Sequence, residues 1–582
     1  MRIYILFACV LIAYSTSFKG GFILDDLSAI RENRTIRRLY PLSIPLTPPK
    51  QTSVSGRPLL NLSFALNYAI SGLDVGSYHL FNLLIHAASA LLVYGVIRRA
   101  LRFFRNRFQT RADQIAFVSS LLWAVHPLQT ESVAYIIQRA ESLAGFFILG
   151  TLYCAVRSAE TQKNIFWIMA SVLSCALGIL VKEVAAVAPL LVLSHDFLFS
   201  GDSWRGLARR RWMLYAGLFC SWAILPLVSF GERSGSAGFG AAGYGPIAYG
   251  ITQIGVITHY LRLCFHPHPL VFDYAWGVDE NFGDVIFPGI LLGGLLFLTL
   301  WFFIRRSPMG FPGAWFFLIL APTSSIFPIH TEVAAERRMY LPLAAVVVSV
   351  VLIFCRFFDL LEKRNPSFKT HRSKAASMLA FLCVAILCVM TMERNTDYHD
   401  PEVLWKHVLE HQPQNSRAYL NLGIIYLEQG RKQDAIDIYE EALGCGIDTT
   451  EGARVHANLA HLLLDQDQFE KAWEHYEKAV VSDPEGDVFM NYFGIDLGRR
   501  GRIREAETAF RKALEANPRN YSAHNNLGKI LEILNKKQEA RKHYEEALRL
   551  KPDWEQVRKT IDRLNQEMGK GEQPDSVTSN AE

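Results

Sequence analysis

Long apolar runs crowd into the first 392 residues of this 582-residue chain. A helix needs about 20 residues to cross a hydrocarbon core of about 30 Å, and only helices and closed barrels pair all their backbone groups inside a bilayer. The first run is Ile3–Phe18, and ten more begin near His79, Ile115, Leu143, Ile165, Val184, Trp212, Val285, Phe311, Met339 and Ala375. We therefore expect a helical membrane domain of about eleven spans over residues 1–392.

The first run could be a signal peptide, but no small-residue cleavage site follows before Asp25 and Asp26, so we interpret it as an uncleaved first helix. Four basic clusters set the orientation, because loops rich in Lys and Arg stay in the cytoplasm. They are Arg98–Arg111, Arg205–Arg211, Arg305-Arg306 and Arg356–Lys374. A full span at Ile247–Phe265 would move Arg305 and Arg306 to the other side. We therefore expect that run to be interfacial or re-entrant.

The rest of the chain differs in charge. Residues 393–582 carry 35 Asp+Glu and 26 Lys+Arg, net −9, whereas residues 1–392 carry 20 and 34, net +14. The total of +5 therefore sums a basic membrane half and an acidic soluble half, and it gives no indication of a nucleic-acid partner. On the topology above, the soluble half lies outside the cytoplasm.

The soluble half repeats every 34 residues. Pro484, Pro518 and Pro552 keep this spacing, as do Ala472, Ala506 and Ala540. Small residues on a first helix and an aromatic residue on a second helix are typical of tetratricopeptide repeats. We expect an all-α chain: a membrane domain over 1–392, a linker helix over 393–416, four repeats over 417–554, and a helix end with a polar tail over 555–582.

Conspicuous polar residues fall on the predicted outer face, opposite the basic loops. Ionisable groups at membrane depth are costly unless they line a wet or paired site, so their presence indicates function. Several on one face indicate a cavity that opens outward. They include Asp25-Asp26, Arg57, His126–Glu131, Arg139, Glu141, Lys182-Glu183, His266–Asp273 and Glu332–Arg338.

Three of these groups suggest specific chemistry. Burial and mutual repulsion would raise the proton affinity of the Asp25-Asp26 pair, which suits a general base; helix capping is the alternative. Arg337 and Arg338 offer forked donors to a phosphate, with headgroup anchoring as the alternative. Lys182 and Glu183 either join this site or form a structural ion pair. His266-Pro267-His268 lacks a second ligand motif, so we expect no metal there.

The combination resembles the GT-C class of membrane glycosyltransferases. The segments that carry the resemblance are Asp25-Asp26, Arg57-Pro58-Leu59, Tyr78–His86, His126–Glu131, Lys182-Glu183, Pro322–Ser325 and Glu336–Pro342. Together they are similar to the transmembrane and tetratricopeptide-repeat (TMTC-like) O-mannosyltransferase family. Four repeats are fewer than the animal members carry, so a bacterial member is expected, with its repeats in the periplasm or outside the cell. In a eukaryote the repeats would lie in the lumen of the endoplasmic reticulum.

The resemblance implies transfer of a sugar, typically mannose, from a polyprenyl- or dolichyl-phosphate carrier to Ser or Thr of a protein bound by the repeats. It assigns the base to Asp25 or Asp26 and the carrier phosphate to Arg337, Arg338 and Lys182. The sugar pocket is expected to hold the remaining outer residues, Arg57, His126, Glu131, Arg139, Glu183, His266 and Glu336. No cofactor is firmly implied, although Asp25-Asp26 could ligate a divalent cation instead.

Two other functions stay open at this stage. A non-catalytic repeat scaffold for envelope proteins, held by a membrane anchor, would not need paired aspartates. A transporter of lipid-linked sugars would need polar groups on both faces, whereas this sequence concentrates them on one.

Overall fold

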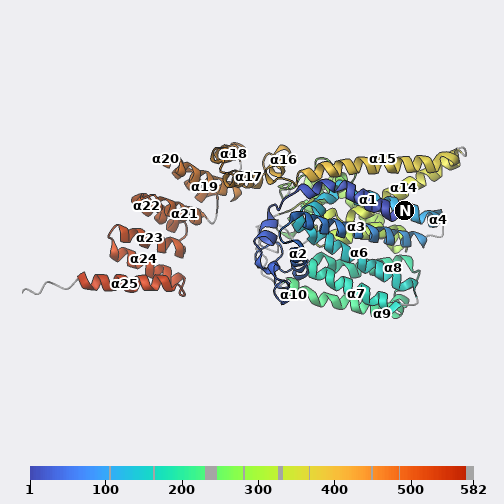
Figure 1. The fold of residues 1–582 in the computed structure, drawn as a ribbon, viewed down its shortest axis with the longest axis horizontal. Coiled ribbons are helices and arrows are strands. Elements are labelled where there is room, and N and C mark those ends of the chain that lie inside the picture. Colours follow the sequence, from blue (N-terminus) through green and yellow to red (C-terminus); the bar gives the residue numbers. More distant parts are fainter. Residues whose placement is uncertain are drawn as a thin grey trace, which may run out of the picture. The chain divides into compact units, whose positions relative to one another are not determined.

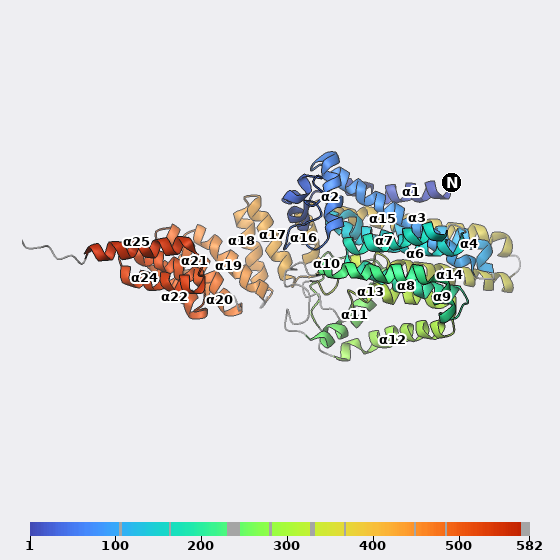
Figure 2. The same ribbon diagram turned by 90° about the horizontal axis from the view of Figure 1, so that it is seen from below.

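The computed structural model describes residues 1–103, 107–161, 164–229, 245–278, 282–325, 332–365, 368–446, 450–483 and 486–571. Residues 572–582 of the expected polar tail lie outside this part. The chain divides into two compact units, Met1–His411 and Gln412–Glu582. Both are helical, with no strand among the residues described, which confirms the all-α class (Figures 1 and 2).

Six helices of the first unit contain segments long and apolar enough to cross a bilayer. They are α3 (Val75–Arg102), α6 (Arg139–Glu160), α7 (Asn164–Val181), α12 (Phe282–Ile304), α14 (Pro342–Arg364) and α15 (Phe368–Thr396). Helix α6 packs against both α3 and α7, and these three lie side by side in the bundle (Figure 1). The unit is that of a membrane protein.

The other expected spans fall on helices that are shorter or less apolar. They are α1 (Arg2–Ala13), α4 (Arg107–Ala124), α8 (Ala188–Phe199), α9 (Trp204–Cys220) and α13 (Phe311–Leu320). Proline explains some of the boundaries, because Pro189 and Pro312 stand in the first turns of α8 and α13 and Pro127 follows α4. The total of eleven crossings stays a prediction, as does the interfacial placement of α11 (Pro246–Phe265), a 20-residue helix.

A long outer segment separates α1 from α2 (Pro58–Ser71). Within residues 27–40, two short turns are helical, Leu27–Arg31 and Arg34–Arg37. Asn61 of α2 holds this segment: it accepts a hydrogen bond from Asn33 Nδ2 and donates one to the Pro45 carbonyl, both at 2.8 Å. Hydrogen bonds from buried asparagine side chains therefore hold this irregular backbone in place.

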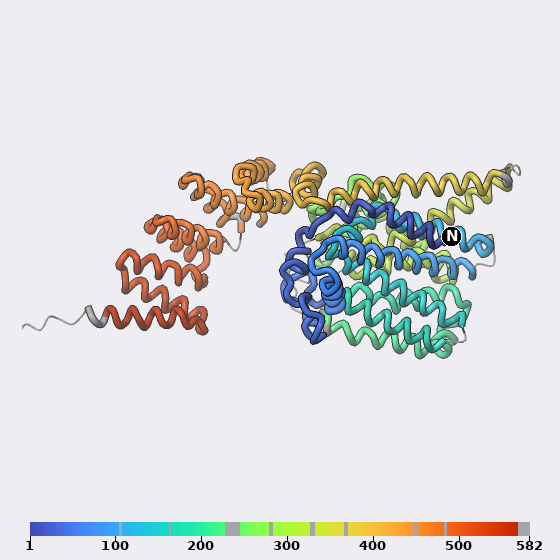
Figure 3. Tube along the Cα trace, viewed as in Figure 1, coloured from blue at the N-terminus to red at the C-terminus, as the bar shows by residue number. Residues whose placement is uncertain are grey.

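The repeat unit consists of four helix pairs and one further helix (Figure 3). The pairs are α17 (Ser416–Glu428) with α18 (Lys432–Gly444), α19 (Thr450–Asp465) with α20 (Phe469–Ser482), α21 (Gly486–Arg499) with α22 (Ile503–Ala516), and α23 (Tyr521–Ile533) with α24 (Lys537–Leu550). Helix α25 (Glu555–Gly571) follows, while α16 (Pro401–His411) belongs to the first unit. The repeat motif was correctly predicted from the sequence.

Glycine permits the close approach within these pairs. A Cβ atom on Gly494 of α21 would lie 2.6 Å from the ring of Phe510 on α22, and one on Gly528 would lie 2.8 Å from the ring of Tyr544. Both contacts are shorter than real Cβ atoms make, so the period of small and aromatic residues follows from packing.

We predict that Gly494→Ala destabilises its helix pair. Overpacking against Phe510 costs about 1–3 kcal/mol, which exceeds the gain of about 1 kcal/mol that Ala brings to a helix. Hydrogen exchange of the full-length protein should show faster exchange in α21 and α22. Gly444→Ala is the control, since a Cβ there meets nothing within 4 Å; equal effects of the two changes would contradict the packing argument.

Candidate active site

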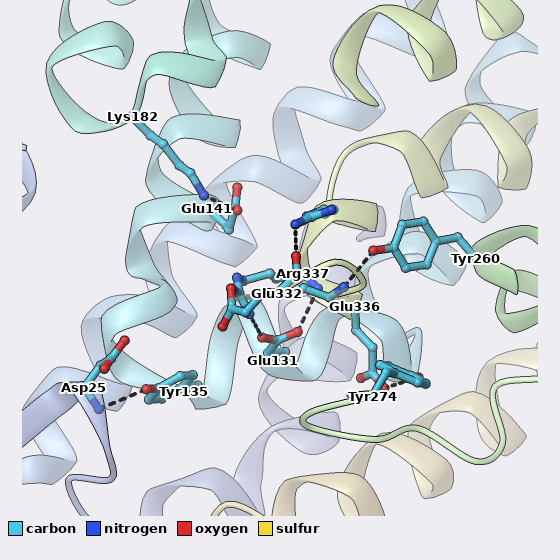
Figure 4. Close-up of polar contacts among 12 residues, drawn as sticks. Asp25, Glu131, Tyr135, Glu141, Lys182, Tyr260, Tyr274, Glu332, Glu336 and Arg337 are labelled. Carbon is cyan, nitrogen blue, oxygen red and sulfur yellow. Dashed lines mark hydrogen bonds and ion pairs between the residues drawn. The ribbon is translucent and has the colours of Figure 1, made fainter. Parts of the chain in front are cut away.

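The outer loop after α1 presents one aspartate and buries the other. Asp25 is exposed, and its backbone N–H donates to the Tyr135 hydroxyl at 3.1 Å (Figure 4). Asp26 is fully buried and accepts from the backbone N–H of Ile23 at 3.1 Å and of Ile137 at 2.7 Å. Asp26 therefore ties the loop to the segment that precedes α6.

Burial raises the pKa of Asp26 well above its usual value, and the neighbouring charge of Asp25 raises it further. The two backbone N–H donors and Arg139 oppose this shift. The raised proton affinity expected for the pair is thus found at Asp26, whereas the exposed carboxylate is that of Asp25.

Arg337 stands between two carboxylates. Its guanidinium pairs with Glu131 and Glu332, and its backbone N–H donates to Glu131 Oε2 at 2.8 Å (Figure 4). Glu131, on α5 (Thr130–Ala134), has a side chain only 2% exposed, whereas that of Glu332 is 40% exposed. The inner partner is fixed, and the outer one faces solvent.

Arg338 and Glu336 point to other partners. The Arg338 guanidinium donates to the Val333 carbonyl at 2.9 Å, to Ser324 Oγ at 3.4 Å and to the Glu332 carbonyl. Glu336 accepts from the Tyr274 hydroxyl at 2.8 Å and pairs with Arg394 at 3.4 Å. Arg338 thus closes the 332–338 segment on itself, and Glu336 connects it to α15.

Lys182 adds a third cation. Its ammonium pairs with Glu141 of α6 and is buried. Burial lowers the pKa of Lys182, the carboxylates of Glu141 and Glu183 oppose that shift, and the charges of Arg57 and Arg337 lower it further. These charges therefore lie within electrostatic reach of one another. Arg57 itself donates to the Ser53 carbonyl at 2.8 Å.

A cleft of about 370 Å³, open solvent included, lies beside Arg337 and Arg338. Its lining includes Glu141, Thr323, Arg337, Arg338 and Tyr340. Apolar residues complete the wall, namely Ala144, Gly145, Ile148, Val184, Ile319 and Leu341. The cleft is therefore charged on one side and apolar on the other, as a phosphate attached to a lipid would require.

The buried hydroxyl of Tyr135 relates the cleft to the aspartate loop. Burial raises the pKa of Tyr135, the charges of Asp25 and Asp26 raise it further, and Arg337 opposes them. The charges of the candidate base and of the candidate phosphate ligand Arg337 therefore both act on the Tyr135 hydroxyl. In Figure 4, Asp25 and Tyr135 lie below and to the left of the Glu131–Arg337 pair, and Lys182 lies above and to its left.

Three predicted pocket residues serve elsewhere. Arg139 is completely buried between α2, α3 and α6, where it donates to Asn82 Oδ1 at 2.6 Å and to the Ser63 and Tyr78 carbonyls at 3.2 Å. His126 accepts from the Leu128 N–H and contacts the Cys264 carbonyl, each at 3.2 Å. His266 is exposed and bonds to the His268 carbonyl at 2.9 Å.

Each of these placements has a physical reason. Arg139 is enclosed by aromatic rings, with Phe64 at 4.5 Å and Phe81 at 4.6 Å, so it stabilises the helix junction. Burial lowers the pKa of His126 to about 4, which suits a neutral imidazole that caps a turn. The sequence put all three on the outer face but did not show which way they point.

Other contributors were not assigned roles from the sequence. Tyr135, Tyr274, Thr323 and Arg394 each contact or line the site, yet none stands in a charged motif. The spacing of Tyr135, four residues after Glu131, was the available signal. Among the residues described, no group of three or more His, Cys, Asp or Glu side chains could hold a metal ion.

Comparisons with known proteins divide the chain in the same way. The family model described as dolichyl-phosphate-mannose-protein mannosyltransferase matches residues 55–230. Tetratricopeptide-repeat models match residues 402–449, 453–485 and 493–553. Protein O-mannosyl-transferase Tmtc3 of Drosophila melanogaster is 25% identical over 622 residues, covering 91% of this chain and 65% of that protein.

The chain is TMTC-like. TMTC4 of Mus musculus is 26% identical over 489 residues, covering 74% of this chain and 64% of that protein, and mouse TMTC1 is 31% identical over 207 residues, 32% of this chain and 21% of its own. The chain thus spans just under two thirds of the first two relatives. The resemblance to TMTC-like proteins predicted from the sequence is confirmed, while the expected bacterial origin stays a prediction.

One solved structure gives a weaker likeness to the TMTC-like chain. The apo oligosaccharyltransferase of Archaeoglobus fulgidus aligns with a TM-score of 0.41 at 12% identity, over 72% of this chain and 60% of that one. This score is too low to establish a shared fold.

Glu336 should make the stability of this TMTC-like chain pH-dependent. Burial raises its pKa from 4.5 to about 7. The folded protein therefore binds the proton more tightly than the unfolded chain, and stability falls as the pH rises between these two values, by roughly 3 kcal/mol in full. Thermal unfolding of Glu336→Gln should lose this pH dependence, and Glu332→Gln, at an exposed site, should keep it. An unchanged pH profile in Glu336→Gln would contradict the assignment.

Proposed function

We propose that the chain transfers a mannosyl group from a polyprenyl- or dolichyl-phosphate carrier to Ser or Thr hydroxyls of proteins on the extracytoplasmic side. One observation supports the proposal: the exposed Asp25, whose backbone N–H bonds to the buried Tyr135, and Arg337 of the cationic cleft both act electrostatically on that tyrosine. A glycosyl transfer needs both, a base at the acceptor hydroxyl and cations at the leaving phosphate. The mannosyltransferase family model and the names of the relatives support the substrate class.

In the proposed reaction Asp25 removes the proton from the acceptor hydroxyl as its oxygen attacks the anomeric carbon of the sugar. Arg337 and Arg338 bind the carrier phosphate as the bond from the sugar to the phosphate breaks, and Lys182 adds positive charge to the cleft. Asp26 positions Asp25 through its bonds to Ile23 and Ile137. Its two oxygens are engaged with backbone N–H groups, so the base is assigned to Asp25.

The Arg337 guanidinium has to lose one of its two carboxylate partners before it can bind a phosphate. Glu131 is buried and holds the guanidinium from the inside, so it would stay. Glu332 is 40% exposed, and water can solvate its carboxylate when the carrier phosphate replaces it. We infer that Glu332 occupies the position that the carrier phosphate takes when it binds.

The repeat unit would bind the acceptor protein, since stacked helix pairs of this type form extended protein-binding surfaces. The topology predicted from the basic loops would put this half on the opposite side of the membrane from them. Its acceptors would therefore be exported proteins.

The two aspartates should respond differently to the same change. Asp25→Asn removes the base and should lower transfer by roughly 10²–10⁴-fold without lowering the unfolding temperature. Asp26→Asn keeps the base but weakens the two buried backbone contacts, so it should destabilise the protein. The measurements are transfer of mannose from polyprenyl-phosphate mannose to a Ser/Thr peptide and thermal unfolding. Full activity in Asp25→Asn would exclude this mechanism and would favour the scaffold alternative.

Opposite effects are expected for the two glutamates that flank Arg337. Glu332→Gln removes a competitor of the phosphate and should lower the KM for the lipid donor, because an exposed ion pair of this kind contributes little stability. Glu131→Gln leaves Arg337 without its buried partner and should reduce kcat/KM by about tenfold or more. Steady-state kinetics against donor concentration would measure both. A rise in KM for Glu332→Gln would show that this residue holds the donor instead of competing with it.

A further inference from the structure

A second cavity lies deeper in the membrane unit, at the end of the bundle that carries the basic loops. The space between its walls is about 650 Å³ when the open solvent at its mouth is included. Its walls come from α3, α6, α8, α13, α14 and the turn at Pro308–Gly310 and are apolar, with Val96, Leu101, Phe199, Met309, Ala345 and Leu352 among them. Met309 is 44% exposed at its edge, so the cavity opens to the surroundings of the bundle.

The depth of this cavity matches one leaflet of a bilayer. On α3 its lining runs from Val93 to Leu101, which at 1.5 Å per residue is about 12 Å. Half of a hydrocarbon core of about 30 Å is about 15 Å. On α13 the lining ends at Trp315, whereas the outer cleft begins at Ile319. The cavity and the candidate active-site cleft therefore lie along different parts of α13.

Exposed arginines stand at the basic end of the cavity. Arg102 directly follows the lining residue Leu101, and Arg305 and Arg306 precede the lining residue Pro308. Arg102 is 51% exposed and lies 3.8 Å from Asp113, and Arg306 donates to the Asp202 carbonyl at 3.0 Å. Three exposed arginines thus adjoin, along the chain, residues that line the cavity at its basic end.

A buried histidine lies behind the aromatic wall. His195 stacks on Phe199 at 4.6 Å and meets the edge of Phe311 at 5.5 Å, and both rings line the cavity. His195 is 4% exposed, and its Nε2 atom has no hydrogen-bond partner among the residues described. His195 itself does not line the cavity, so the two rings separate it from any occupant of that space.

We propose that this cavity is a binding site for an anionic phospholipid, separate from the donor cleft. One acyl chain fills the apolar space, and the phosphate binds at Arg102, Arg305 and Arg306. Basic pockets between membrane helices recognise such headgroups through charge, and the arginines offer paired donors to phosphate oxygens. The site lies on the leaflet opposite the proposed chemistry, so its occupant anchors the bundle and takes no part in sugar transfer.

Native mass spectrometry of the full-length protein tests this site. Purified protein would be titrated with phosphatidylglycerol, with phosphatidylcholine of the same acyl chains, and with polyprenyl phosphate. We expect phosphatidylglycerol to bind at least tenfold more tightly than phosphatidylcholine. The double change Arg305→Gln with Arg306→Gln should remove most of that preference. Lys363→Gln with Arg364→Gln is the matched control, since both are exposed basic residues at the end of α14 beyond the cavity.

Filling the cavity tests the acyl-chain part. Val96→Trp should reduce phosphatidylglycerol binding at least tenfold, whereas Ile353→Trp, at a 68% exposed position of α14, should not. If Val96→Trp fails to fold, Ala345→Leu occupies part of the same space. Equal binding of the two phospholipids would overturn the proposal, as would unchanged binding in a folded cavity variant. If a cavity variant loses binding of polyprenyl phosphate but keeps binding of phosphatidylglycerol, the cavity holds the tail of the donor. That result would also contradict the proposal.

Discussion

The ion pair between Glu131 and Arg337 organises the face of the membrane unit that the sequence predicts to be outer. Both oxygens of Glu131 are engaged by Arg337, one through the guanidinium and one through the backbone N–H. A buried carboxylate without this partner would cost several kcal/mol, so the short helix α5 and the 332–338 segment are held together. Tyr340, just beyond that segment, strengthens the junction, because its carbonyl accepts from Trp123 at 2.8 Å and from Gln129 at 3.1 Å.

The charged residues of this face fall into two classes by exposure. Asp26, Arg139 and Glu336 are buried and form their hydrogen bonds with backbone groups and with side chains of neighbouring segments. Asp25 and Glu332 are exposed beside the same groups. The buried class fixes loops in a region where regular secondary structure is short, and the exposed class is available to substrate. A reactive carboxylate on a rigid support is what general-base catalysis requires.

The sequence predicted the all-α class, the membrane unit and the repeats because each rests on a period or a length. The pairing of Gly494 with Phe510 recurs as Gly528 with Tyr544, because the two helices of each pair approach closely at the glycine. For the site, the sequence predicted which segments contribute but not which side chains contact one another. Asp25 and Asp26 are equivalent in sequence, and their different roles arise from the loop that turns one carboxylate inward. Arg139 carries a charge on the outer face, but its burial among Phe64 and Phe81 depends on how α2 crosses α3. Arg394 pairs with Glu336 across 58 residues, a distance along the chain at which no local pattern indicates contact.

A structure of the full-length protein with polyprenyl-phosphate mannose bound would test the account most directly. The account predicts the phosphate on Arg337 and Arg338, with Glu332 displaced to solvent, Glu131 still paired, and the anomeric carbon of the sugar facing Asp25. A phosphate bound away from these arginines, or a sugar on the far side of the Glu131–Arg337 pair from Asp25, would contradict it.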